Sequence, residues 1–189
     1  MRTRHQINRT IPSPALAQFL AIQTEFTSDI DVLNYALTLE HLEAAFYAMA
    51  GDYALGTDPY GNSIDEWAAV VGEHEAAHVT TLTDVITQLG GEPVAAAEYD
   101  FGVTDAQSFL MTAATLENVG VSAYDGAGQF ISDPDLLTAA GSIVAVEARH
   151  AAYFNLVTGQ EPFPGPFETP MTPDEVLEAA GGFIVSDGM

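Results

Sequence analysis

Apolar residues recur every three or four positions along four long stretches of the chain, the spacing that places them on one face of a helix. The four stretches cover residues 29–50, 63–89, 104–128 and 133–158. Shorter amphipathic patterns precede them at 13–24 and follow them at 174–180. The pattern therefore predicts an all-α fold with four long helices and short terminal helices.

Capping residues and glycines mark the ends of these helices. Capping boxes are expected from Ser63 with Glu66 and from Thr104 with Gln107, and Asp133 precedes a proline at the start of the fourth long helix. Each long helix has a glycine at its expected end. These glycines are Gly51, Gly90, Gly128 and Gly159.

The lengths of the connections predict how the helices are arranged. The second helix would be about 40 Å long, and the link from Gly90 to Val103 is long enough to span it when extended. We therefore expect an up-down bundle with a crossover between the second and third long helices, and the short link at Asp133 makes the third and fourth antiparallel. The expected divisions are an N-terminal extension (1–28), the bundle (29–159) and a Pro-rich tail (160–189).

The bundle contains an internal repeat. Glu40 and Glu117 each follow a Thr-Leu pair, and each is followed by a tyrosine seven residues later, Tyr47 or Tyr124. A glycine comes eleven residues after each glutamate. The first and third helices therefore share one plan.

The second and fourth helices carry a second repeated motif, Glu-x-x-His. Glu75 precedes His78 by three residues, and Glu147 precedes His150 by three. Residues at this spacing project from one helical face about a turn apart, which suits two ligands of one metal site. Each helical hairpin thus offers one lone glutamate and one Glu-x-x-His pair.

Charge balance gives this set of six residues a chemical meaning. Four carboxylates would balance the charge of two divalent metal ions, and two neutral imidazoles would complete a site with no net charge. A buried cluster must be close to neutral. Oxygen and imidazole ligands suit iron and manganese. The predicted metal ligands are Glu40, Glu75, His78, Glu117, Glu147 and His150.

The composition is strongly acidic, with 27 acidic side chains, four arginines and a formal net charge of -23. Such a surface repels phosphate backbones, so we do not expect a nucleic-acid partner. The absence of lysine indicates adaptation to a very salty environment, where screening weakens repulsion between surface carboxylates. The absence of cysteine excludes disulfides and thiolate metal sites.

Targeting signals are weak. No apolar run is long enough for a membrane span. The basic start is followed by Pro12 and Pro14 instead of an apolar run, so no signal peptide is predicted. The expected location is cytoplasmic by default, and an extracytoplasmic one stays open.

Residues 31–158 resemble the ferritin-like superfamily, and more narrowly the ferritin-like domain proteins related to desiccation-associated proteins. The resemblance implies a centre of two iron ions, or alternatively two manganese ions. Glu40 and Glu117 match the lone carboxylates of such centres. Tyr47 and Tyr124 match tyrosines near the metals, with a catalytic role. No cysteine centre of the rubredoxin type is present, and a cage for iron storage is not implied.

The function expected from this resemblance is a di-metal oxidoreductase that oxidises ferrous iron or reacts with dioxygen or peroxide, in oxidative or desiccation stress. One alternative is peroxide dismutation of the manganese-catalase type. Another is a non-enzymatic, structural or stress-protective bundle. The partners would be metal ions and dioxygen or peroxide, and a homo-oligomer is open.

Several other residues near the predicted ligands have more than one interpretation. His74 to His78 also spells H-E-x-x-H, the zinc-protease motif, but this hypothesis leaves the repeat in the second half unexplained. Glu43 is either an extra ligand or a solvated or supporting carboxylate. His74 is expected beside the ligands or on the surface, His41 on a polar flank, and Arg149 in a salt bridge.

Overall fold

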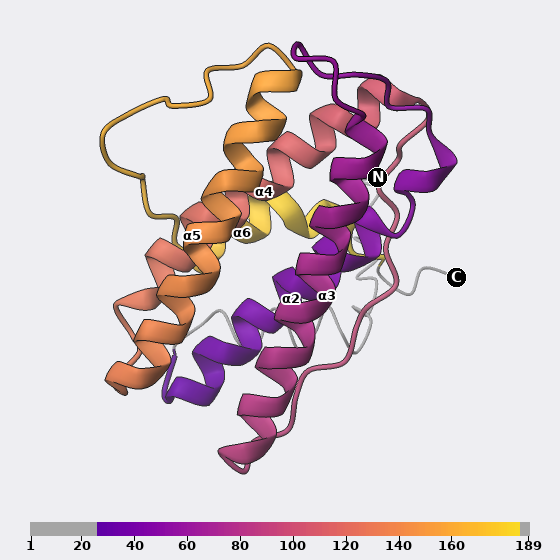
Figure 1. Ribbon diagram of the computed structural model, residues 1–189. Helices are drawn as coiled ribbons and strands as arrows, with labels where there is room; N and C mark the ends of the chain where they lie inside the picture. Colours follow the sequence, from indigo (N-terminus) through magenta and orange to yellow (C-terminus); the bar gives the residue numbers. More distant parts are fainter. Residues whose placement is uncertain (1–25, 186–189) are drawn as a thin grey trace, which may run out of the picture.

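The computed structural model describes residues 26–185, which form five α-helices and no strand (Figure 1). The all-α prediction is confirmed, whereas the short helix expected at 13–24 lies outside the described residues. No described helix is long and apolar enough to cross a membrane. The helices are α2 (Asp29–Tyr47), α3 (Ile64–Gln88), α4 (Ala106–Gly128), α5 (Pro134–Val157) and the short α6 (Pro173–Ala180).

Side-chain caps begin the long helices. Ser63 accepts a hydrogen bond from the Glu66 backbone at the start of α3, as expected, and Asp133 caps α5. The cap predicted for α4 was wrong by one residue. Asp105 is the cap, and Ser108 completes the capping box. Aspartate accepts more strongly than threonine, and the Ser108 hydroxyl bonds to the Asp105 backbone.

Two helix ends differ slightly from the prediction. The α2 helix ends at Tyr47, three residues before Ala50, and the chain continues into a single 3₁₀ turn at Ala50–Asp52. The α3 helix ends at Gln88, so Leu89 is largely exposed, although the apolar pattern placed it on the inner face.

The long helices pack as two antiparallel hairpins, α2 with α3 and α4 with α5. The segment between α3 and α4 runs back along the bundle, so α4 runs parallel to α3, as the crossover prediction requires (Figure 1). Asn34 of α2 holds this segment. Its side chain accepts from the Val94 backbone at 2.7 Å and donates to the Glu92 carbonyl at 3.2 Å.

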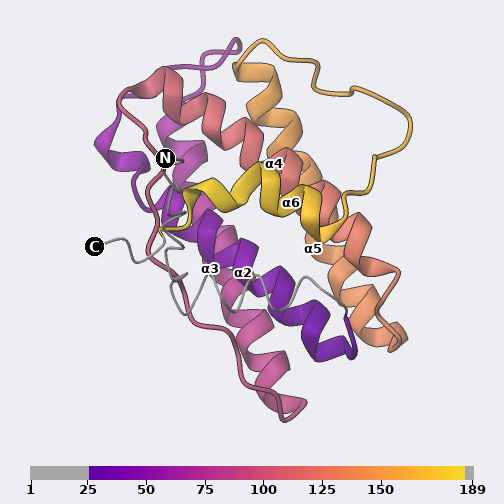
Figure 2. The ribbon, with the colours of Figure 1, turned by 180° about the vertical axis from the view of Figure 1, so that it is seen from behind.

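The tail returns to the bundle and places α6 against α4 (Figure 2). The Met171 backbone donates to the Ser122 carbonyl at 3.0 Å. A Cβ atom at Gly126 would lie 1.9 Å from the Met171 carbonyl oxygen, so only glycine permits this crossing. Ile184 is then buried in the core and forms an isolated bridge with Tyr99 of the crossover segment.

The bundle interior combines apolar clusters with buried acids. Phe46 stacks on Phe109 with ring centroids 4.4 Å apart, and Tyr47 packs against Phe154 at 5.7 Å. Acids are rarely buried without compensation. Among residues 26–185 the buried glutamates are Glu40, Glu43, Glu75, Glu117 and Glu147.

Candidate metal centre

All six side chains expected as ligands lie together inside the bundle. The lone glutamates come from α2 and α4, and the Glu-x-x-His pairs come from α3 and α5. On each helix a buried apolar residue precedes the glutamate by three or four positions, so packing of the apolar face turns the glutamates inward. These residues are Leu37, Val71, Ala113 and Ile143. The ligand atoms converge into two groups, each within 4.8 Å.

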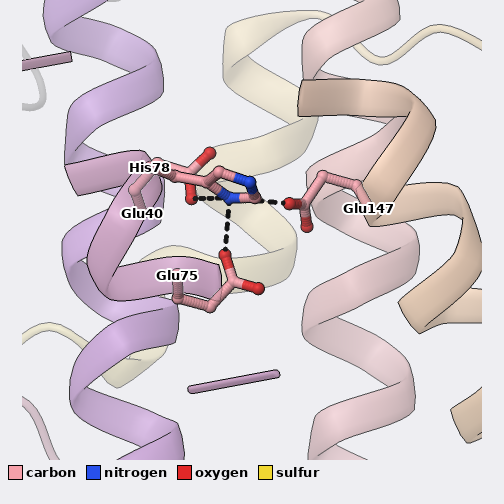
Figure 3. A group of neighbouring side chains, drawn as sticks. All are labelled: Glu40, Glu75, His78 and Glu147. Carbon is pink, nitrogen blue, oxygen red and sulfur yellow. Dashed lines mark hydrogen bonds and ion pairs between the residues drawn. The ribbon is translucent and has the colours of Figure 1, made fainter. Parts of the chain in front are cut away.

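The first group surrounds the imidazole of His78. Its Nδ1 atom lies 3.1 Å from oxygens of Glu40, Glu75 and Glu147. Glu40 and Glu75 come from the same hairpin as His78, and Glu147 reaches across from the other hairpin (Figure 3). A ring nitrogen carries at most one hydrogen, so it cannot satisfy three carboxylates.

The second group surrounds His150 in the same way. Its Nδ1 atom lies 3.1 Å from an oxygen of Glu75 and 3.3 Å from one of Glu117, but neither approach has hydrogen-bond geometry. Both oxygens of Glu147 are also buried without a hydrogen-bond partner. Nδ1 of His150 and the oxygens of Glu147 thus point toward shared centres and form no hydrogen bonds. Bound cations would satisfy atoms in this arrangement.

Glu75 and Glu147 belong to both groups, whereas each of the other ligands belongs to one. A carboxylate has two oxygens and can bind two cations at once. The shared pair therefore suits bridging positions, and Glu40 and Glu117 suit terminal positions. The donor set contains only carboxylates and imidazoles, and these residues fit iron or manganese.

The buried charges perturb one another strongly. Burial by itself lowers the pKa of His78, but the carboxylates of Glu147 and Glu40 outweigh it and raise the pKa to about 12. Burial raises the pKa of Glu40 well above its usual range, and the carboxylate of Glu147 adds to the rise. Without metal ions the cluster thus retains protons, and cations that bind would displace them.

The two tyrosines of the repeat contact the lone glutamates, but not those of their own helices. Tyr47 of α2 donates its hydroxyl hydrogen to Glu117 of α4. Tyr124 of α4 donates to Glu40 of α2. Because both bonds are buried, they fix the orientation of the Glu117 and Glu40 side chains.

Four of the six predicted ligands are buried glutamates, and Glu43 is a fifth buried glutamate beside them. It belongs to neither ligand group. Burial raises its pKa well above the usual range, and the carboxylates of Glu147 and Glu117 add to the rise. A solvated position, one alternative left open by the sequence, is therefore wrong. The signal available in the sequence was its place one turn after Glu40.

The remaining candidates have other surroundings. Nδ1 of His74 lies 3.0 Å from Nε2 of His150, and the two rings stack at 5.2 Å. His74 belongs to neither ligand group, so the geometry does not support a zinc-protease site. His41 is half-buried and contacts the Val94 carbonyl at 3.1 Å, instead of lying on an open polar flank.

Comparison with known proteins supports the fold. The family model of the ferritin-like domain matches residues 28–160. A conserved hypothetical protein from Mycobacterium tuberculosis has a similar structure, with a TM-score of 0.59 and 21% sequence identity over 70% of this chain and 98% of that chain. No curated protein matches the sequence significantly.

Proposed function

Because the chain belongs to the ferritin-like domain family, we propose that its buried carboxylate and histidine cluster binds two metal ions and oxidises ferrous iron with dioxygen or peroxide. The observation that carries this proposal is the convergence of six side chains from four helices on two adjacent centres. Two iron ions are the expected cofactor, and two manganese ions are the alternative.

The ligand roles follow from the two groups. Glu75 and Glu147 would bridge the metals, since each contributes to both groups. His78 and His150 would bind through Nδ1, the nitrogen that faces the carboxylates. The Nε2 atom of His150 must then carry its hydrogen and donate it to His74, which fixes the orientation of the ring.

When bound, the metal pair supplies the capacity to exchange electrons with dioxygen or peroxide. The chain holds the reacting groups away from water, since the glutamate ligands are fully buried. Glu40, Glu75, Glu117 and Glu147 would hold the two metal ions and balance their charge. Tyr47 and Tyr124 hold Glu117 and Glu40 by hydrogen bonds. Each tyrosine would act as a hydrogen-bond partner or as a one-electron donor.

A non-enzymatic, structural role for the bundle does not account for the buried glutamate and histidine cluster. Five buried glutamates cost much stability when no cation compensates them. A protective bundle without metal ions would be more stable with apolar residues at these positions. A role in oxidative or desiccation stress fits the oxidation chemistry and remains part of the proposal.

The test is elemental analysis of protein purified in high salt without a chelator. We expect about two iron or manganese ions per chain. The Glu75→Gln variant should lose them, whereas Glu73→Gln should retain them, because Glu73 is exposed two residues away on the same helix. Absence of stoichiometric metal, even after anaerobic reloading, would contradict the proposal.

Activity measurements then separate the two metal chemistries. Consumption of dioxygen or peroxide with oxidation of ferrous iron supports the iron reaction. Steady release of oxygen from peroxide by the manganese form would support dismutation instead. Metal-loaded protein that consumes neither oxidant would leave metal binding intact but contradict the proposed reaction.

A further inference from the structure

A surface pocket of about 420 Å³ lies beside the metal centre. It is formed between the first half of α3, the second half of α5 and the loop before α3, which contribute Trp67, Tyr153 and Asp58 respectively. His150 lines this pocket as well as the ligand cluster. A molecule in the pocket would therefore lie one imidazole ring away from the proposed metals.

Arg149 supplies the positive charge of this pocket. It is the only lysine or arginine among residues 26–185, and the other arginines lie in the first nine residues of the chain. The salt bridge expected for Arg149 is not found within the described residues, where no acidic oxygen lies within 4.0 Å of its guanidinium and no side-chain hydrogen bond engages it. In so acidic a protein, an arginine without an ion pair in a pocket is placed to receive an anion.

The pocket also presents aromatic surface. Trp67 is 45% exposed, although it is the largest apolar side chain in the protein. The Tyr153 hydroxyl is buried and has no hydrogen-bond partner among the described residues. His74 adds an exposed ring stacked on His150. Flat aromatic side chains of this kind suit a planar ligand.

Among the described residues, Asp58 is the one carboxylate that lines the pocket, and both of its oxygens accept hydrogen bonds. One accepts from the backbones of Tyr60 and Asn62 at 2.9 Å, and the other accepts from the Asn62 side chain at 2.9 Å. Asp58 is also 5% exposed. These hydrogen bonds hold Asp58 within the loop and direct its oxygens toward Tyr60 and Asn62.

We propose that this pocket binds a small organic anion with an aromatic ring, with its carboxylate on Arg149 and its ring against Trp67 and Tyr153. Pockets that hold small organic molecules measure about 300–1,000 Å³, so the space is adequate for one ring or two. The binding itself does not depend on the proposed metal chemistry, because none of these three side chains is a metal ligand. Bound there, such a molecule lies next to the His74 and His150 pair.

Trp67 is the only tryptophan in the chain, so its fluorescence reports on the pocket alone. Benzoate should quench this fluorescence saturably in the full-length protein, in both the metal-loaded and metal-free forms. Its neutral counterpart benzamide should bind at least about tenfold more weakly, since it lacks the charge that Arg149 recognises. Cyclohexanecarboxylate, which keeps the charge but not the flat ring, should also bind more weakly.

The Arg149→Gln variant should raise the dissociation constant for benzoate about tenfold or more. Its matched control is Gln88→Glu, which changes the net charge by the same amount at the far end of α3. Arg149→Lys keeps the charge without the planar fork and should retain part of the affinity. Circular dichroism establishes that each variant is folded.

Three results would overturn the proposal. One is the absence of saturable quenching by benzoate at millimolar concentrations, with calorimetry agreeing. Another is equal affinity for benzoate and benzamide. The third is unchanged affinity in folded Arg149→Gln. Because the titration is read in metal-free protein too, failure of the metal proposal does not affect its outcome.

Discussion

Glu43 of α2 places its carboxylate directly over Gly120 of α4. A Cβ atom at Gly120 would lie 3.0 Å from the nearer oxygen of Glu43 and 3.7 Å from an oxygen of Glu147. In the internal repeat, Gly120 follows Glu117 by three residues, as Glu43 follows Glu40. One half of the repeat thus contributes a carboxylate, and the other half leaves the space for it.

This contact predicts the effect of Gly120→Ala. Alanine in a helix interior is favoured over glycine by about 1 kcal/mol, but the new methyl group would push the Glu43 carboxylate toward Glu147. We expect no net stabilisation in urea denaturation, together with weaker binding of added ferrous iron or manganese. The control is Gly141→Ala in α5, where a Cβ meets nothing within 4 Å, and it should stabilise. Equal stabilisation by both alanines would refute this view of Glu43.

The Glu40→Gln variant separates metal binding from folding. Burial raises the pKa of Glu40 well above its usual range, so the metal-free protein already favours its neutral form. Glutamine should therefore leave the melting temperature of metal-free protein unchanged or higher. At a hundredfold excess over its dissociation constant, metal should raise the free energy of unfolding of the wild type by about 2.7 kcal/mol. This increase should be smaller for the variant. Calorimetry with and without metal measures both quantities, and an unchanged metal effect would exclude Glu40 as a ligand.

His41 predicts a pH dependence that does not involve the cluster. Burial lowers the pKa of His41 below its ordinary value of 6.5. The unfolded chain then binds the proton more readily, so this contribution to stability is complete above pH 6.5 and is lost as the pH falls through the folded-state pKa. Urea denaturation should show a steeper loss below that pH for the wild type than for His41→Gln. Parallel curves for the two proteins would contradict the prediction.

The crossover segment depends on Asn34. Replacing it by alanine removes the acceptor for the Val94 backbone and the donor to the Glu92 carbonyl. The buried Val94 backbone would lose its partner, so we expect a loss of about 2–3 kcal/mol in the free energy of unfolding. Thr87→Ala removes an exposed hydrogen bond within α3 and should cost far less. Similar losses for both variants would show that Asn34 does not anchor the segment.

Salt should stabilise the protein by screening. With a net charge of -23, the surface carboxylates repel one another in the folded state. The Debye length falls from about 10 Å at 0.1 M salt to about 3 Å at 1 M. The urea midpoint should therefore rise steeply in dilute potassium chloride and level off toward 1 M. A purely linear rise would indicate a general salt effect instead of screening.

Sequence patterns predicted most of the fold because helix formation depends on interactions between residues close together in the chain. The 3.6-residue period of apolar positions predicts the long helices, and the length of the 90–103 link predicts the crossover. Helix ends were less accurate because competing caps differ by small energies. Asp105 replaced Thr104 at the start of α4, and α2 ended at Tyr47 instead of Ala50.

By itself, the sequence determined the six candidate ligands, since spacing on a helix fixes the face on which a residue lies. Contacts between helices depend on how the hairpins pack, and no local pattern encodes that packing. Only the tertiary structure decided that Glu75 and Glu147 are shared by both ligand groups and that each tyrosine bonds the glutamate of the opposite half. It also decided that Arg149 lies in an aromatic pocket beside His150, because that pocket forms only where α3, α5 and a distant loop meet.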